Sequence, residues 1–426
     1  MHDAEAPDTP PVKPPAKPSH DPYEVLRNPD FRLYLIARFI ATVGQMMFVM
    51  AVNWEIYERT YDSGYGRLAL GCVGLTLVLP LIFFTLPAGH VADNYNRKHV
   101  IMITTSILAL ALIGLAVVSA VQAPVPYIYL CLLVGGSART FMWAATASFL
   151  PQLVDRQHFP KAINWTSSSF QLSSILGPIA AGQLIGHFHH AWIVYVVNAT
   201  ASLTCCVLVG FVHTHHSVVK KEKMTFAALR TGFDFVFKNR IILGIITLDM
   251  FAVLLGGCTA LLAVFAKDIL FVGPRGLGFL QAALPLGAIL CSFILAHRPP
   301  LQKAGRSLLI AVTIFGLATI VFGLSKWYWL SFLMLFICGA SDNVSVVVRH
   351  TLVQLLTPDE KRGRVSAVNN LFIGTSNEMG EFESGLVAQW LGPVFAVVSG
   401  GVGTILVVLG VARIWPEIRK YGKLTG

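Results

Sequence analysis

Long apolar stretches without a charged residue recur along this chain, and they constrain its fold more than any other feature. Residues 68–88 and 100–121, for example, contain no Asp, Glu, Lys or Arg. A helix rises about 1.5 Å per residue, so about twenty residues cross the roughly 30 Å of hydrocarbon in a bilayer. Backbone polar groups cannot stay unpaired in lipid, which restricts such stretches to helices. The sequence therefore predicts an all-α membrane protein with twelve transmembrane helices. The predicted spans cover residues 31–54, 67–88, 100–121, 127–149, 165–187, 191–212, 240–266, 276–297, 307–325, 327–350, 368–390 and 392–413.

The composition agrees with a chain that lies mostly in lipid. Of the 426 residues, 55% are hydrophobic and 13% are charged, whereas soluble domains carry about 25% charged residues. The net charge of +10 does not indicate a nucleic-acid partner, because the basic residues are spread over short loops between spans. Of the 32 Lys and Arg residues, 24 fall in segments on the side of the termini and 5 on the opposite side. This bias predicts that both termini are cytosolic.

The spans and the segments between them divide the chain into five parts. The first thirty residues are rich in proline and have no apolar period, which predicts a disordered tail. The longest internal connection has helical apolar spacing from Thr225 to Phe237, so it could hold an amphipathic helix on the membrane surface. The predicted parts are a disordered cytosolic tail at 1–30, an N-terminal six-helix bundle at 31–212, a cytosolic linker at 213–239, a C-terminal six-helix bundle at 240–413 and a cytosolic tail at 414–426.

An internal repeat supports the division into two halves. The segment Leu150-Pro-Gln152-Leu recurs as Leu352-Val-Gln354-Leu, and two glycines five residues apart in span 5 recur at the same spacing in span 11. Parallel repeats of six spans are typical of transporters whose halves are related by an axis along the membrane normal. We therefore predict two pseudo-symmetric bundles.

The connection between the second and third spans carries charged residues at regular spacing after a glycine. Its sequence is Gly89-His-Val-Ala-Asp93-Asn-Tyr-Asn-Arg97-Lys98. This spacing resembles the loop between helices 2 and 3 of the major facilitator superfamily of transporters, although two asparagines replace a basic residue and a glycine of the family pattern. The resemblance implies a gating loop at Gly89, Asp93, Arg97 and Lys98. In this loop Asp93 would hold the two halves together through charge–helix contact, with Arg97 as its local partner.

A glycine–proline pair interrupts the fifth predicted span, within Gly177-Pro178-Ile-Ala-Ala-Gly182. Proline removes a backbone hydrogen bond and bends a helix, while small residues let another helix approach closely. The segment resembles a glycine-rich motif of exporters in the same superfamily, which implies a hinge at Gly177, Pro178 and Gly182. A simple packing kink is the alternative.

The resemblance to this superfamily extends over about residues 23–413. The segments Phe31 to Arg38, Leu248 to Gly257 and Arg362 to Gly385 look like its enterobactin-exporter-like branch. This implies a multi-pass protein of the bacterial inner membrane that exports a siderophore or another amphipathic, drug-like molecule. The proton gradient would be the energy source, with no cofactor, and we expect a monomer to function. Uptake or facilitated transport of a small metabolite, and a receptor that has lost transport, stay open as alternatives.

Ionisable residues within the spans are candidates for proton coupling. A charge in mid-bilayer costs about 2.5–3.5 kcal/mol, so it usually faces a cavity and has a partner. Glu378 and Glu381 are three residues apart and share a helical face. We predict that the proton-sensitive group lies among Asp249, Glu378 and Glu381, with Arg139 or Arg349 as the counter-charge. Static ion pairs between helices are the alternative. Further charges in the spans are Arg38, Asp342 and Glu383.

Amide and aromatic side chains within the spans are candidates for the wall of a substrate cavity, because buried amides need polar partners inside the bundle. The candidates are Gln45, Asn53, Trp54, Trp143, Gln171, Asn369, Asn370 and Asn377. Two His-x-His-His runs flank the sixth span without neighbouring Cys or acidic ligands, and we expect no metal site. No Walker motif or catalytic triad is evident, so we expect no enzyme.

Overall fold

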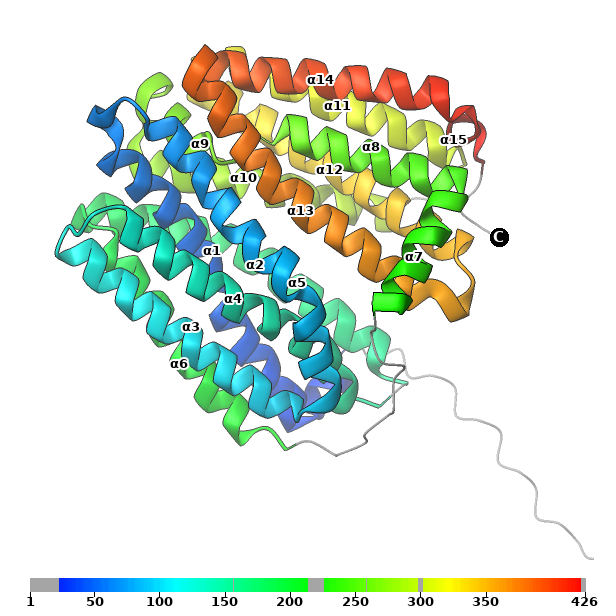
Figure 1. Ribbon diagram of the computed structural model, residues 1–426, viewed down its shortest axis with the longest axis horizontal. Helices are drawn as coiled ribbons and strands as arrows, with labels where there is room; N and C mark the ends of the chain where they lie inside the picture. Colours follow the sequence, from blue (N-terminus) through cyan, green and yellow to red (C-terminus); the bar gives the residue numbers. More distant parts are fainter. Residues whose placement is uncertain (1–22, 156, 214–225, 258, 298–301, 423–426) are drawn as a thin grey trace, which may run out of the picture.

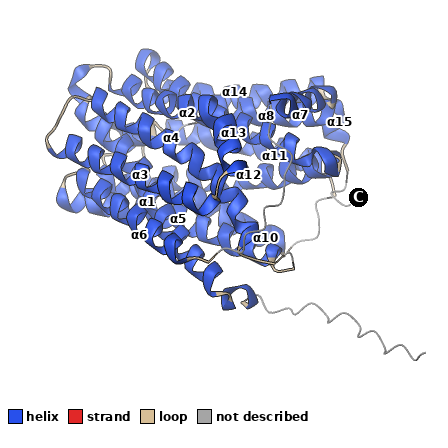
Figure 2. Cartoon of the chain, turned by 60° about the horizontal axis from the view of Figure 1, so that its bottom comes forward, coloured by secondary structure: helices blue, strands red, loops and turns tan. Residues whose placement is uncertain are grey.

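The computed structural model describes residues 23–422 apart from 156, 214–225, 258 and 298–301. Throughout these residues the regular structure is helical (Figures 1 and 2). Twelve helices have 17 or more residues, which confirms the predicted all-α class. They are α1 (Pro29–Arg59), α2 (Gly66–Asn94), α3 (Arg97–Ala120), α4 (Pro126–Phe149), α5 (Phe159–Phe188), α6 (Trp192–Phe211), α8 (Arg240–Gly256), α10 (Gly273–Ala296), α11 (Ala304–Leu324), α12 (Tyr328–Leu356), α13 (Asp359–Leu391) and α14 (Pro393–Ile414).

The long helices form two groups of six. Helices α1 to α6 pack mainly against one another, and α8 and α10 to α14 form the second group (Figure 1). The two groups meet mainly where α2 crosses α13 and where α5 crosses α10. Under the six-span repeat α2 corresponds to α10 and α5 to α13, so the two crossings are equivalent. A pseudo-two-fold relation between the bundles requires that the two crossings be equivalent in this way.

Most of the long helices are suited to lipid. Nine of the described helices are long and apolar enough to cross a membrane, and the count reaches ten if the bent pair of α7 and α8 is one span. Among the remaining long helices, α5 and α13 carry many polar residues. Both lie at the boundary between the bundles, where polar side chains can face the other bundle instead of hydrocarbon.

The seventh span differs from its predicted course. A continuous helix over 240–266 is wrong, because α8 ends at Gly256 and the chain continues through a short α9 (Leu262–Val264) into a π-helical turn, Phe265–Ile269. The break follows two adjacent glycines, which carry no side chain and permit close approach of another backbone. The carbonyl oxygen of Gly257 accepts a hydrogen bond from the hydroxyl of Ser384 at 2.7 Å, so α13 satisfies a group that the break frees. Hydropathy does not reveal such a break, because the sequence is apolar on both sides of it.

Parts of both predicted tails are ordered. Residues Glu24–Arg27 form a short 3-10 helix, and the side chain of Asn28 accepts hydrogen bonds from the first turn of α1. Glu24 binds the ammonium of Lys161 at 2.7 Å, which ties this segment to the start of α5. At the other end, α15 (Pro416–Lys420) packs against α11 and buries Ile418. The predicted disordered tail at 1–30 is therefore too long, whereas the tail predicted at 414–426 includes the short helix α15. Residues 1–22 and 423–426 lie outside the described residues.

The linker contains the helix α7 (Phe226–Lys238), which meets α8 at an angle of 102°. Its Val236 is buried, and the ring of Phe233 lies 5.9 Å from that of Phe372 on α13. Through Val236 and Phe233, α7 thus packs against the C-terminal bundle, whereas Phe237 is exposed. The rest of the linker, 214–225, lies outside the described residues.

Candidate functional site

A cavity of about 690 Å³ lies between the two bundles. Helices α1, α2 and α4 form one wall and α13 forms the other, each through residues near the end that faces the chain termini; we call this end the terminal side. Its charged, amide and aromatic wall residues are Arg38, Asp93, Trp143, Arg364 and Asn370. Pockets for small ligands typically measure about 300–1,000 Å³, so the cavity can hold a drug-sized molecule.

Contacts between the bundles concentrate on the opposite end, which we call the far side. The hydroxyl of Tyr57 on α1 donates to the carboxylate of Asp268 in the π-helical turn. The ammonium of Lys267 lies 4.5 Å from the ring centroid of Tyr61, within range of a cation–π interaction. We call Tyr57, Tyr61, Lys267 and Asp268 the far-side clasp. Gln389 adds a hydrogen bond to the carbonyl oxygen of Gly64 at 2.6 Å.

Between the cavity and the clasp, α2 and α13 approach each other closely. A methyl group added at Gly74 would overlap the backbone oxygen of Glu378 and touch the side chain of Glu381. One helical turn away, a methyl group added at Gly385 would overlap the backbone of Gly71. The two carboxyl-bearing residues therefore lie at one of the two close crossings between the bundles.

The positive charge of one residue, Arg139, acts on the carboxyl groups of both Glu378 and Glu381. Oε1 of Glu381 accepts a hydrogen bond from the hydroxyl of Thr259 at 3.1 Å. The charge of Arg139 on α4 acts on both Glu378 and Glu381, yet it forms no ion pair with either in the described part of the chain. The first bundle thus supplies the cation and the second supplies the carboxyl groups.

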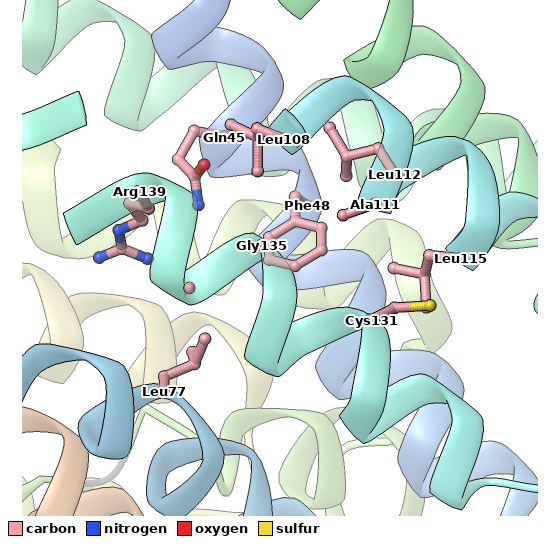
Figure 3. Close-up of a pocket in the computed structure, with 11 residues that line it drawn as sticks. Gln45, Phe48, Leu77, Leu108, Ala111, Leu112, Leu115, Cys131, Gly135 and Arg139 are labelled. Atoms are coloured by element: carbon pink, nitrogen blue, oxygen red, sulfur yellow. The ribbon is translucent and has the colours of Figure 1, made fainter. Parts of the chain in front are cut away.

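Arg139 also borders a second, much smaller space. This cavity of about 20 Å³ lies within the first bundle, and Figure 3 shows Gln45 and Arg139 at one end of it, with Leu115 and Cys131 at the other. Such a volume is about that of one water molecule. The guanidinium of Arg139 lies 5.0 Å from the ring centroid of Trp143, which lines the large cavity. Arg139 therefore connects the interior of the first bundle with the cavity wall.

Asp249 has a different environment from the carboxyl pair. It forms an ion pair with Arg349, and both side chains are buried between α8 and α12. Both helices belong to the second bundle, so this pair does not cross the boundary between the bundles. The structure brings together Asp249 with Arg349, and separately Glu378 and Glu381 with Arg139.

The predicted cavity residues separate into three groups. Trp143 and Asn370 line the large cavity, and Gln45 borders the small one. Asn53, Trp54 and Asn369 are buried. Of these, Asn53 leaves its side-chain oxygen without a hydrogen-bond partner within the described residues. Asn377 donates to the carbonyl oxygen of Ile373 at 2.9 Å, and Gln171 is half-buried on α5.

The segment predicted as a gating loop is mostly helical: Gly89 and Asp93 lie in the last turns of α2, where they line the cavity, and Arg97 and Lys98 begin α3. The expected pairing of Asp93 with Arg97 is wrong. Arg97 instead donates to the backbone oxygens of Ala92 and Ser148, both at 3.2 Å. Carbonyl groups at helix C-termini carry partial negative charge, and the ends of α2 and α4 offer them to this guanidinium. Lys98 makes the same kind of contact with the end of α6, at 2.7 Å from the oxygen of Gly210.

The predicted hinge in α5 is a site of close packing between helices. A methyl group at Gly177 would overlap Met46 on α1, and one at Gly182 would overlap the backbone of Pro274 on α10. The helix α5 is continuous through Pro178. These small residues thus let α5 lie against α1 in its own bundle and against α10 in the other.

Sequence reasoning missed a buried polar cluster in the first bundle. Glu55 accepts a hydrogen bond from the hydroxyl of Tyr195 at 2.6 Å and lies 3.2 Å from the guanidinium of Arg59. The first span was predicted to end at residue 54, whereas α1 runs to Arg59. The spacing of four residues between an acid and a base was the available signal. The far-side clasp was also missed, because its partners are distant in sequence.

Two six-helix bundles with a drug-sized cavity between them define a polytopic membrane transporter. The chain belongs to the Major Facilitator Superfamily, whose family model matches residues 34–380. Relatives in sequence include the enterobactin exporter EntS of Escherichia coli O1:K1 / APEC and that of Shigella boydii serotype 18 (strain CDC 3083-94 / BS512). Each is 25% identical to this chain over 398 residues, which is 92% of the chain and 94% of the relative.

Solved structures share the fold. The nucleoside transporter NupG superposes with a TM-score of 0.69 at 16% identity, covering 92% of this chain and 99% of that one. A bacterial homologue of the human lysosomal transporter Spinster, in an inward-facing and unoccupied conformation, gives 0.69 at 13% identity, covering 92% and 98%. The POT family transporter PepTSo gives 0.71 at 12% identity, covering 92% and 99%. At such identities the likeness shows the fold alone.

Proposed function

We propose that this transporter is a proton-coupled exporter that moves a siderophore or another amphipathic, drug-like molecule by alternating access. The observation that carries the proposal is the place of Glu378 and Glu381 at the α2–α13 crossing, under the influence of Arg139. A proton can drive a change between two states only if it binds them unequally. Carboxyl groups at the contact between the moving bundles meet this condition.

The net charge of Arg139, Glu378 and Glu381 gives the direction in which proton binding shifts the conformation. With one proton bound, Arg139 and the two carboxyl groups are neutral in sum, which suits a dry and closed α2–α13 contact. Loss of the proton leaves one excess negative charge, which is better placed in water, so the far side would open. Protonation therefore favours the arrangement described here, with the far side closed and the cavity on the terminal side. Proton entry from outside would then return the empty carrier to the state that loads from the cytosol.

Export is supported by the distribution of basic residues and by the relatives. If the terminal side is cytosolic, as the Lys and Arg bias predicts, the cavity faces the cytosol and can load from it. The sequence relatives at 25% identity are named as enterobactin exporters. Since both cavity walls, the carboxyl pair and the clasp belong to one chain, we propose a monomer in the bacterial inner membrane that needs the proton gradient and no cofactor.

Transport by the purified full chain in phosphatidylcholine liposomes tests this function. A pH gradient is imposed, uptake of a catecholate siderophore and of common efflux dyes is measured, and proton movement is followed with a pH-sensitive dye. We expect substrate-dependent proton flux. Glu378→Gln and Glu381→Gln should each abolish gradient-driven accumulation but retain substrate exchange without a gradient, because only the coupling group is lost.

Glu383→Gln is the matched control, since it removes the same charge from the same helix outside the closest α2–α13 contact. It should leave accumulation unchanged. Unaltered rates and an unaltered pH profile in both the Glu378 and Glu381 variants would remove these residues from coupling. Accumulation without any proton movement would reject antiport itself.

A further inference from the structure

Arg38 lies in the cavity wall, and within the described part of the chain it has no carboxylate partner. It is nine residues into α1, or roughly 13 Å along a helix that is long and apolar enough to cross a membrane. Its guanidinium donates to the neutral hydroxyl of Tyr34 at 3.2 Å, and it forms no ion pair within the described residues. Since a guanidinium has five N–H donors, this bond leaves most of its donor capacity for a molecule in the cavity.

The opposite wall of the cavity carries a second guanidinium, that of Arg364 on α13. The two arginines therefore belong to different bundles. Trp143, whose side chain is 55% exposed, lines the same space, and aliphatic side chains such as Leu81 and Leu371 complete much of the wall. The cavity thus combines cationic groups on two sides with a large apolar and aromatic surface.

Within the described residues, no acidic group forms an ion pair with Arg38. Asp93 is the carboxylate that lines the cavity in the described part of the chain, and it forms no ion pair there. Glu378 and Glu381 lie at the α2–α13 crossing and are not among the residues that line the cavity. Arg38, which forms no ion pair within the described residues, is therefore a cation that can attract an anion into a space with low-dielectric walls.

We propose that the cavity binds amphipathic organic anions, with Arg38 as the residue that recognises the acidic group. A guanidinium matches a carboxylate, sulfonate or phosphate through paired N–H donors. The apolar or aromatic body of the ligand contacts Trp143 and the aliphatic wall. This inference rests on the proposed transport function and names its substrate class.

Two probes with the same ring system separate charge recognition from simple apolar binding. They are 8-anilinonaphthalene-1-sulfonate and the uncharged N-phenyl-1-naphthylamine, and binding to the full chain in phosphatidylcholine nanodiscs is compared with empty nanodiscs. We expect Arg38→Gln to weaken binding of the sulfonate by roughly tenfold or more, the usual effect of losing a charged hydrogen bond, and to leave the uncharged probe unchanged. Arg38→Lys should keep most of the affinity for the sulfonate.

Arg32→Gln is the matched control, because Arg32 is exposed on the same helix and does not line the cavity. It should leave both affinities unchanged. Trp143→Ala should weaken both probes, since it removes apolar wall that they share. An equal loss for both probes in Arg38→Gln, or no loss for the sulfonate, would overturn anion recognition.

Two further measurements identify the source of the anion and separate this inference from the function on which it rests. If phosphatidylglycerol added to the nanodiscs displaces the sulfonate one for one, Arg38 recognises a lipid headgroup, and recognition of a soluble amphipathic anion is overturned. Gradient-driven transport of the uncharged probe alone would leave export intact and reject anion specificity. Binding of the sulfonate that depends on Arg38, without gradient-driven flux of either probe, would keep the site and reject proton-coupled export.

Discussion

At the scale of single residues, three carboxyl groups of the second bundle have different surroundings. Asp249 is buried and forms an ion pair with Arg349 inside one bundle. Glu378 and Glu381 lie at the crossing of α2 and α13, where the positive charge comes from the other bundle and no ion pair forms within the described residues. A group locked in an internal pair has little freedom to exchange protons as the bundles move. We therefore propose that Asp249 contributes to stability and that the other two take part in proton coupling.

Removal of either partner of the buried pair should strongly destabilise the protein. Asp249→Leu or Arg349→Met leaves one uncompensated buried charge, which typically costs about 3–5 kcal/mol. The double variant removes both charges and should regain most of the stability, as measured by the unfolding temperature of the purified protein in detergent.

Transport by the double variant should also persist. If it kept the wild-type unfolding temperature but lost gradient-driven transport, Asp249 would belong to the coupling machinery.

At the scale of helices, small residues decide how the two bundles meet. Gly71 and Gly74 let α2 approach α13, and Gly182 lets α5 approach the backbone of Gly278 on α10. The far-side clasp adds polar contacts at the same end, where Tyr57 and Lys267 join segments more than 200 residues apart. Closure of the far side thus depends on the absence of side chains at the crossings and on a few polar contacts beyond them.

Gly74→Val should act as a wedge that opens the far side. The added side chain would overlap the backbone of Glu378, and a backbone cannot move aside without separating the helices. Spin labels at Asp62 and Phe271, which are exposed on different bundles, should report a longer far-side distance in this variant. Gly410→Val is the control, because an added Cβ there meets no atom within 4 Å. An unchanged distance distribution in Gly74→Val would show that the crossing does not govern closure.

At the scale of the whole molecule, orientation in the membrane determines whether the cavity loads from the cytosol. The 24 basic residues on the side of the termini, against 5 on the opposite side, predict that the cavity faces the cytosol. A green fluorescent protein fused after Gly426 should then be fluorescent in cells. Alkaline phosphatase inserted between α1 and α2, next to Gly64, should be active because this connection would lie outside the cytosol. The reverse pattern would place the cavity outside and reject export in the proposed direction.

The sequence by itself determined the number of long helices, their approximate bounds and the superfamily. The number and bounds of the helices depend on the sum of side-chain transfer free energies over about twenty neighbouring residues, and such sums need no knowledge of the fold. The superfamily followed from the resemblance of short motifs. The charged motif at the junction of α2 and α3 and the glycines of α5 were recognisable because each motif lies within one short segment. Only the structure showed that the charged motif lines the cavity and that the glycines of α5 lie at helix crossings.

Only the tertiary structure decided which charges meet. It placed Arg97 on the ends of α2 and α4 rather than on Asp93, and it joined Glu55 to Tyr195, 140 residues away. It also broke the seventh span after Gly256. A polar group in lipid must find a partner. Several other helices offer a partner of suitable charge, and hydropathy does not distinguish among them. The choice among them is made by packing, which brings particular atoms within about 3 Å and leaves the others apart.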